Sequence, residues 1–210
     1  MIAAALFDLD GVIVDTEPSY TLFWRQAGRD FGIPGDDFAD IIKGQTLTHI
    51  LSTYFPEPDR AREVVKALAD FEATMDFPLV PGALDFICRL RAMGIPAAVV
   101  TSSDQTKMKS LYRARPDFIG YFDVILTAED AQRSKPHPDC YLTAAHRLGC
   151  DIERCVVFED SINGLKAGRA AGATVVGLST SLPKAIIEPL SDHVIADFTH
   201  TDEVAPLRGI

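Results

Sequence analysis

Acidic side chains occur in two close groups that could share one site. Asp8 and Asp10 come directly after a short apolar run, and Glu159 and Asp160 come directly after another. Side chains two residues apart on an extended chain share a side, so Asp8 and Asp10 could face one small group. The same residue types also serve as turn and cap residues, so Asp160 could instead cap a following helix.

Hydroxyl groups and a lysine follow other apolar runs. Thr101, Ser102 and Ser103 precede a helix that is expected to begin at Asp104. Helix N-termini present unpaired N–H groups and partial positive charge, so these donors suit a phosphate, although they also suit an ordinary helix cap. Lys135 lies in a loop that two nearby prolines stiffen. Taken alone, it would be a solvated surface charge.

The charges of these residues predict a cation. If all are ionised, the four carboxylates and Lys135 carry three net negative charges, which would repel an anion. Carboxylate oxygens favour hard divalent ions such as Mg²⁺, and crowded carboxylates retain a proton on one member. A bare carboxylate, an acid and a cation together match phosphoryl transfer through an aspartyl phosphate.

The elements that must position these residues are strands that alternate with helices. The predicted strands are residues 2–7, 97–100, 124–126, 155–158, 174–178 and 193–195. Short apolar runs between segments of helical period are typical of a buried parallel sheet. In such sheets ligands bind beyond the carboxyl ends of the strands, which is where the polar residues lie. The predicted fold is therefore α/β, with a Rossmann-like, mainly parallel sheet.

One stretch departs from this alternation. After the first strand, residues 16–78 contain no convincing strand but carry helical patterns at 19–31, 46–55 and 59–74. Breakers such as Pro18 and Pro78 mark its ends. The predicted domains are a catalytic core, residues 1–15 and 79–210, and an inserted helical cap domain, residues 16–78. In the core, glycines at 164, 168 and 172 predict close approach of one helix to the sheet.

Composition excludes several classes of protein. The 210 residues are 47% hydrophobic and 24% charged, as in folded globular proteins, and the net charge of −10 disfavours nucleic acid and anionic membranes as partners. No apolar run approaches the roughly 18 residues that span a bilayer, and the N-terminal run is too short for a signal peptide. Four scattered cysteines are expected to be reduced. These features predict a cytoplasmic protein. The sequence does not specify the oligomeric state and is compatible with a monomer.

Four motifs in this order resemble those of the haloacid dehalogenase superfamily. They are Asp8–Thr16, Val100–Ser103, Ser134–Pro138, and Phe158–Ser161 with Gly164 and Gly172. The resemblance implies that Asp8 is the nucleophile, that Asp10 is the general acid/base, and that Thr101 and Lys135 bind the phosphoryl group. It also implies a Mg²⁺ cofactor held by Asp8, the Asp10 carbonyl, Glu159 and Asp160.

The insert is similar to the cap of the subgroup that contains beta-phosphoglucomutase and sugar-phosphate phosphatases. There the mutases carry a His five residues after the position of Asp15, and an Arg four residues after a Lys-Gly pair. This chain has Tyr20 at the first position and Leu47 or Thr48 at the second. The resemblance therefore favours a phosphatase acting on a small phosphorylated metabolite over a mutase. The predicted substrate contacts are Ser102, Ser103, Tyr20 and Lys43.

Three other interpretations share part of this pattern. A signalling receiver domain uses similar residue types but lacks a helical insert. A dehalogenase shares the fold and nucleophile but needs neither Asp10 nor magnesium. A non-catalytic phosphate-binding or interaction protein is the third, and it would release no phosphate from any phosphomonoester.

Overall fold

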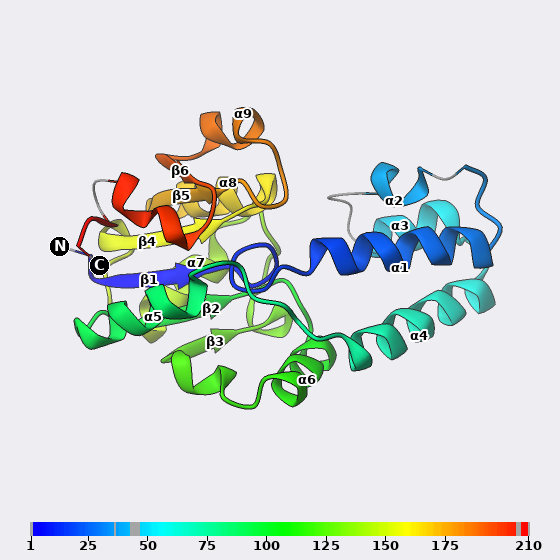
Figure 1. Ribbon diagram of the computed structural model, residues 1–210, viewed down its shortest axis with the longest axis horizontal. Helices are drawn as coiled ribbons and strands as arrows, with labels where there is room; N and C mark the ends of the chain where they lie inside the picture. The colour runs from blue at the N-terminus through cyan, green and yellow to red at the C-terminus, as the bar shows by residue number, and fades with distance from the viewer. Residues whose placement is uncertain (1, 36, 43–46, 205–206, 210) are drawn as a thin grey trace. The chain divides into compact units, whose positions relative to one another are not determined.

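The computed structural model describes residues 2–35, 37–42, 47–204 and 207–209 (Figure 1). The chain forms two compact units, one comprising Met1–Asp15 with Phe77–Ile210 and the other comprising Thr16–Asp76. The assignment of these units as catalytic core and cap stays a prediction.

The larger unit is built on six strands in the order β3-β2-β1-β4-β5-β6, and every neighbouring pair is parallel. The strands are β1 (Ala4–Phe7), β2 (Ala97–Val100), β3 (Val124–Leu126), β4 (Cys155–Glu159), β5 (Thr174–Leu178) and β6 (His193–Ile195). The α/β prediction is confirmed, and four strands have the predicted bounds. The first begins two residues later than expected, and β4 extends one residue further, through Glu159.

The strand order places the candidate residues together. The chain begins at the sheet centre with β1, moves outward through β2 and β3, and then crosses to β4 on the other side of β1. The order reverses between β1 and β4, and ligands of open α/β sheets bind beyond the strand ends at such a switch point. The residues after β1 and those at the end of β4 therefore lie at the same crevice.

Helices cover both faces of the sheet (Figure 1). On one face, Phe7 stacks on Phe158 with ring centroids 4.7 Å apart, and Phe86 and Phe198 complete the aromatic cluster. On the other face, Leu6 belongs to the core cluster that includes residues of α7 and α8. Successive side chains of a strand point to opposite faces, so β1 contributes to both layers.

The helices and short 3-10 helices of the larger unit complete these layers. The helices are α5 (Ala83–Ala92), α6 (Gln105–Ala114), α7 (Asp139–Arg147), α8 (Ile162–Ala171) and α9 (Lys184–Ile187). The 3-10 helices are Phe118–Tyr121, Ala128–Asp130, Ile152–Arg154, Glu188–Leu190 and Phe198–Glu203.

Helix α8 approaches the sheet closely, as its glycines predict. A Cβ on Gly168 would lie 3.0 Å from side-chain atoms of both Val157 and Val175. A Cβ on Gly164 would lie 1.7 Å from Oε1 of Glu159, so this glycine leaves room for a carboxylate rather than for strand backbone. Gly172 ends the helix in the left-handed conformation, with φ of 89°.

The smaller unit is helical, and no strand occurs among its described residues. Its helices are α1 (Glu17–Asp30), α2 (Phe38–Ile41), α3 (Leu47–Tyr54) and α4 (Pro58–Thr74). Three match the predicted helical patterns, whereas α2 was not predicted. Trp24, Phe38 and Phe55 lie in a core of the unit's own.

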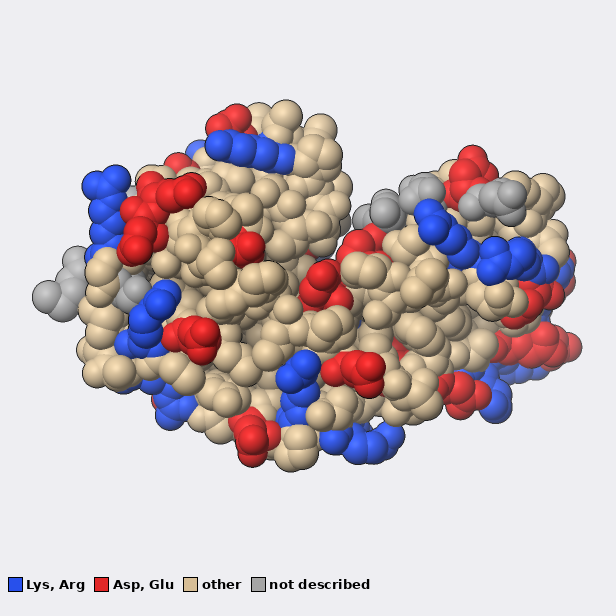
Figure 2. All heavy atoms as spheres, viewed as in Figure 1, with Lys and Arg blue, Asp and Glu red and all other residues tan. Residues whose placement is uncertain are grey.

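Surface charge and helix length bear on possible partners. Acidic and basic side chains are both present on the visible face of each unit (Figure 2), and the whole chain carries a formal net charge of −10. Among the described residues, no helix has both the length and the apolar character required to cross a bilayer.

Candidate active site

The chain leaves β1 through a tight turn that carries the first acidic pair. The carbonyl of Leu9 accepts hydrogen bonds from the amides of residues 12–14, at 3.3, 2.8 and 3.0 Å. Gly11 has φ of 72°, and a Cβ there would lie 2.0 Å from Oδ2 of Asp160. Only glycine fits this conformation and this space, so the turn brings the backbone directly against the carboxylate that follows β4.

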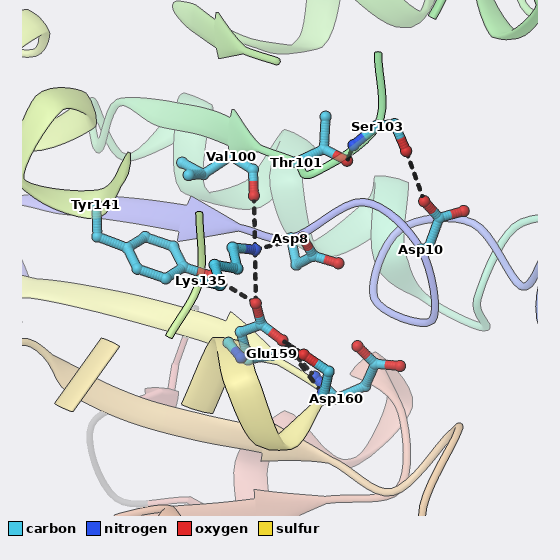
Figure 3. A network of polar contacts seen from close by, with 11 residues as sticks. Asp8, Asp10, Val100, Thr101, Ser103, Lys135, Tyr141, Glu159 and Asp160 are labelled. Carbon is cyan, nitrogen blue, oxygen red and sulfur yellow. Dashed lines mark hydrogen bonds and ion pairs between the residues drawn. The ribbon is translucent and has the colours of Figure 1, made fainter. Parts of the chain in front are cut away.

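Lys135 lies at the centre of the site. Its Nζ donates to Oδ1 of Asp8 at 2.6 Å, to Oε1 of Glu159 at 2.7 Å and to the carbonyl of Val100 at 2.9 Å (Figure 3). An ammonium has three N–H donors, and each of these acceptors takes one. The lysine side chain is only 8% exposed, so its charge acts on the carboxylates with little solvent screening.

Glu159 is fully buried and held by protein groups on both oxygens. Oε1 accepts from Lys135 and, at 2.8 Å, from the hydroxyl of Tyr141. Oε2 accepts from the amides of Asp160 and Ser161, at 3.1 and 3.2 Å, and from the Ser161 hydroxyl at 3.0 Å. A carboxylate offers about four lone-pair directions, so these five donors fix Glu159 in place.

Two carboxyls of the cluster, those of Asp8 and Asp160, have raised pKa values. Burial raises the pKa of Asp8 to about 7, with the attraction of Lys135 opposing this rise and the negative charge of Glu159 adding to it. Burial, followed by the charges of Glu159 and Asp8, raises the pKa of Asp160 well above its ordinary value. Burial opposes the charged form of Lys135, but Asp8 and Glu159 outweigh it and raise the lysine pKa. The cluster therefore holds more negative charge than one lysine offsets.

The residues of this cluster fit a divalent cation. Asp8, Glu159 and Asp160 each offer a carboxylate oxygen, and these atoms all lie within 4.8 Å of one another. Oxygen donors at this spacing suit hard divalent ions. A bound cation would also supply the charge that the raised pKa values of Asp8 and Asp160 show to be missing.

Asp10 turns toward α6 rather than toward Lys135. Its Oδ1 lies 2.7 Å from Nζ of Lys107. Its Oδ2 accepts from the hydroxyl of Ser103 at 2.9 Å (Figure 3). Lys107 was not among the predicted site residues. One signal was available: a lysine in the first turn of a helix opposes the helix dipole, so it needs a separate electrostatic partner.

The hydroxyl residues after β2 have distinct environments. Thr101 is buried, and its Oγ1 accepts from the amide of Ser103 at 2.9 Å. Ser102 is exposed. Asp104 caps α6, with its side chain accepting from the amide of Lys107, so the ordinary Ser/Thr/Asp cap that the sequence allowed is present and is made by Asp104. The predicted role of these hydroxyl groups is to bind a phosphate. The Ser103 hydroxyl already donates a hydrogen bond to Asp10.

The remaining predicted residues lie in different parts of the structure. Ser161 caps α8 by accepting from the amide of Gly164 at 3.1 Å, so the alternative of Asp160 as the helix cap is wrong. Tyr20 lies in the smaller unit, where its hydroxyl donates to Oε1 of Glu72 at 2.7 Å. Lys43 lies outside the described residues. Tyr141 was not among the predicted site residues, and the sequence carried no signal for its bond to Glu159.

The chain is similar to known hydrolases in sequence and in structure. The family model of haloacid dehalogenase-like hydrolases matches residues 2–172. Hexitol phosphatase A of Escherichia coli (strain K12) is 35% identical over 182 residues, which cover 83% of this chain and 82% of that protein. Fructose-1-phosphate phosphatase YqaB of the same organism is 32% identical over 184 residues, covering 83% and 95%. A crystal structure of a HAD hydrolase, family IA, variant 3, from Entamoeba histolytica superposes with a TM-score of 0.80 at 27% identity and covers 95% of both chains.

Proposed function

Because the chain belongs to the haloacid dehalogenase-like hydrolase family, we propose that it is a magnesium-dependent phosphatase of a small phosphorylated sugar or sugar alcohol. The proposed reaction passes through an aspartyl phosphate on Asp8. The observation that carries the proposal is the cluster at the switch point, where Asp8 and Glu159 share Lys135 and three carboxylates lie within 4.8 Å. Its relatives of 35% and 32% identity are phosphoric monoester hydrolases by name.

Asp8 is the proposed nucleophile. One carboxylate oxygen attacks phosphorus, a bond between that oxygen and phosphorus forms, and the bond from phosphorus to the substrate oxygen breaks. Lys135 holds the orientation of the Asp8 carboxylate through the 2.6 Å bond to Oδ1. A water then attacks phosphorus, which releases inorganic phosphate and restores Asp8.

Asp10 is the proposed general acid and base. It gives a proton to the departing substrate oxygen and later removes one from the attacking water. Thr101, buried at the end of β2, is the proposed hydroxyl donor to the phosphoryl oxygens. Asp10 and Asp8 have different lysine partners, Lys107 and Lys135, which is consistent with different chemical roles.

Asp8, Asp160 and the Asp10 carbonyl would hold the magnesium ion. Glu159, the other predicted ligand, offers a carboxylate oxygen to the same group, and its five protein donors hold it in place beside Lys135. When bound, the ion supplies positive charge next to the phosphoryl oxygens.

Two observations favour water over a second sugar hydroxyl as the acceptor. The relatives named above are phosphatases of a hexitol phosphate and of fructose 1-phosphate. Tyr20, which occupies the position of the mutase histidine, donates its hydroxyl to Glu72. We therefore propose hydrolysis and not isomerisation of the phosphorylated sugar.

The test is phosphate release by the purified chain from a panel of phosphorylated hexitols, hexoses and glycerol, with Mg²⁺ and then with a chelator. We expect release that depends on the metal and that Asp8→Asn reduces on the order of 10³-fold or more, because the nucleophile is lost. Asp85→Asn, an exposed aspartate on α5, is the matched control. Unchanged release by Asp8→Asn would contradict the mechanism. Conversion of beta-glucose 1-phosphate to glucose 6-phosphate without net phosphate release would contradict the phosphatase assignment.

A further inference from the structure

Lys107 is a buried lysine for which the proposed reaction has no direct use. It lies in the first turn of α6, and its side chain is only 9% exposed. Its Nζ is 2.7 Å from Oδ1 of Asp10, a residue 97 positions earlier in the chain. Lysines are almost never this buried unless they are paired, and Asp10 is one such partner.

The location of Lys107 is unfavourable on local grounds. The N-terminal turn of a helix carries partial positive charge, which repels an ammonium group. Asp104 offsets part of this charge by capping the helix through the amide of Lys107 at 2.9 Å. Lys107 is thus held by one aspartate through its backbone and by Asp10 through its side chain, and this double attachment fixes the start of α6 against the turn after β1.

The second oxygen of Asp10 is held from the same segment. The hydroxyl of Ser103 donates to Oδ2 at 2.9 Å, while the amide of Ser103 donates to Thr101 Oγ1 at 2.9 Å. Both carboxylate oxygens of Asp10 therefore have donors that come from the 101–107 segment. The Asp10 side chain is 31% exposed, so it is not fully enclosed by packing, and these two donors hold both of its carboxylate oxygens.

We propose that Lys107 and Ser103 are positioning residues that set the orientation of the Asp10 carboxylate for proton transfer to the leaving oxygen. The proposal rests on the phosphatase function proposed above. Asp8 takes its orientation from Lys135, whereas Asp10, two residues later, takes its orientation from Lys107. Separate lysines let two neighbouring carboxylates serve as nucleophile and as acid without sharing one cation.

This role has a consequence that depends on the substrate. The oxygen that leaves from a sugar or sugar-alcohol phosphate is strongly basic and needs a proton as its bond to phosphorus breaks. The oxygen of p-nitrophenyl phosphate leaves as a weakly basic phenolate and does not need one. A misplaced Asp10 therefore slows the first substrate far more than the second.

The test compares kcat/KM for the best phosphorylated sugar alcohol with kcat/KM for p-nitrophenyl phosphate, since kcat/KM covers the steps through departure of the leaving group. A misplacement of about 1 Å can cost about 10²-fold, so Lys107→Met should lower the ratio of the two values by about 10- to 100-fold. Ser103→Ala should lower it by less, and Lys107→Arg should restore part of the loss. Lys109→Met, an exposed lysine two positions further along α6, should leave the ratio unchanged.

A double-variant cycle separates positioning from direct binding. In an Asp10→Asn background, Lys107→Met should change kcat/KM for the sugar-alcohol phosphate by less than about threefold, because the proposed effect of Lys107 on this step passes through the Asp10 carboxylate. Equal losses on both substrates, or full additivity with Asp10→Asn, would overturn the proposal and assign Lys107 to binding the phosphoryl group.

Separate controls distinguish a folding defect of a variant from a loss of the proposed function. Circular dichroism checks each variant, and if Lys107→Met does not fold, an unchanged ratio in Ser103→Ala overturns the proposal by itself. Wild-type chain that releases no phosphate, or Asp8→Asn that remains active, would defeat the phosphatase proposal instead. An active wild type with an unchanged ratio in folded Lys107→Met would defeat only the inference about Lys107.

Discussion

Replacing Lys135 with methionine should destabilise the larger unit strongly. The substitution roughly keeps side-chain length but removes the cation shared by Asp8, which is 13% exposed at its side chain, and Glu159, which is 0% exposed. Removing one partner of a buried ion pair costs about 3–5 kcal/mol, because a charge is left buried without compensation. At about 2–4 °C per kcal/mol for a chain of this length, Tm should fall by about 6–20 °C.

Thermal melts followed by circular dichroism measure this change directly. Lys109→Met removes an exposed lysine and should stay within about 0.5 kcal/mol of the wild type. Adding Asp8→Asn to Lys135→Met should recover part of the lost stability, because it removes one of the two carboxylates left without a cation. A Lys135→Met variant that melts within about 2 °C of the wild type would refute the reasoning that Lys135 offsets buried negative charge.

Two further predictions concern Gly164 and the cysteines. Gly164→Ala places a Cβ 1.7 Å from Oε1 of Glu159, so it should cost about 1–3 kcal/mol and abolish phosphate release; Gly120→Ala, where a Cβ meets nothing within 4 Å, is the control in the same melts and assays. If Gly164→Ala matches the wild type, Glu159 is not confined as described. Iodoacetamide followed by mass spectrometry should label exposed Cys88 in the native chain and spare Cys155, because burial raises the pKa of that thiol to about 11. Equal labelling of the two would contradict the burial of Cys155.

The strands could be predicted because a parallel sheet buries short apolar runs on both faces. The same rule placed the end of β4 one residue too early, since a charged residue is not expected inside a buried strand. Glu159 belongs to the strand because Lys135 and Tyr141, 24 and 18 residues away, supply its donors. The hydrophobic pattern of a short segment does not indicate which distant residues will donate hydrogen bonds to it. Helix α2, with four residues, is too short to show a period.

The part of the candidate site made of acidic residues and a lysine in recognisable motifs could be predicted from the sequence. The structure brings Asp8, Lys135, Glu159 and Asp160 together at the sheet edge as the motif order indicated. Lys107 and Tyr141 were missed because each resembles an ordinary helix residue, one a surface charge and the other part of an apolar face. Their roles depend on single polar atoms that meet Asp10 and Glu159 only after the sheet has formed.

The position of Lys135 in the chain also has a consequence for folding during synthesis. Its contacts with Asp8 and Glu159 span 127 and 24 positions of the chain. Contacts this distant recover their loop-closure entropy only after the intervening strands have paired. During synthesis the ribosome makes Asp8 well before Lys135 and Glu159, so the nascent chain carries the proposed nucleophile for most of translation without these neighbours. The complete cluster can therefore form only after Glu159, at the end of β4, has been made.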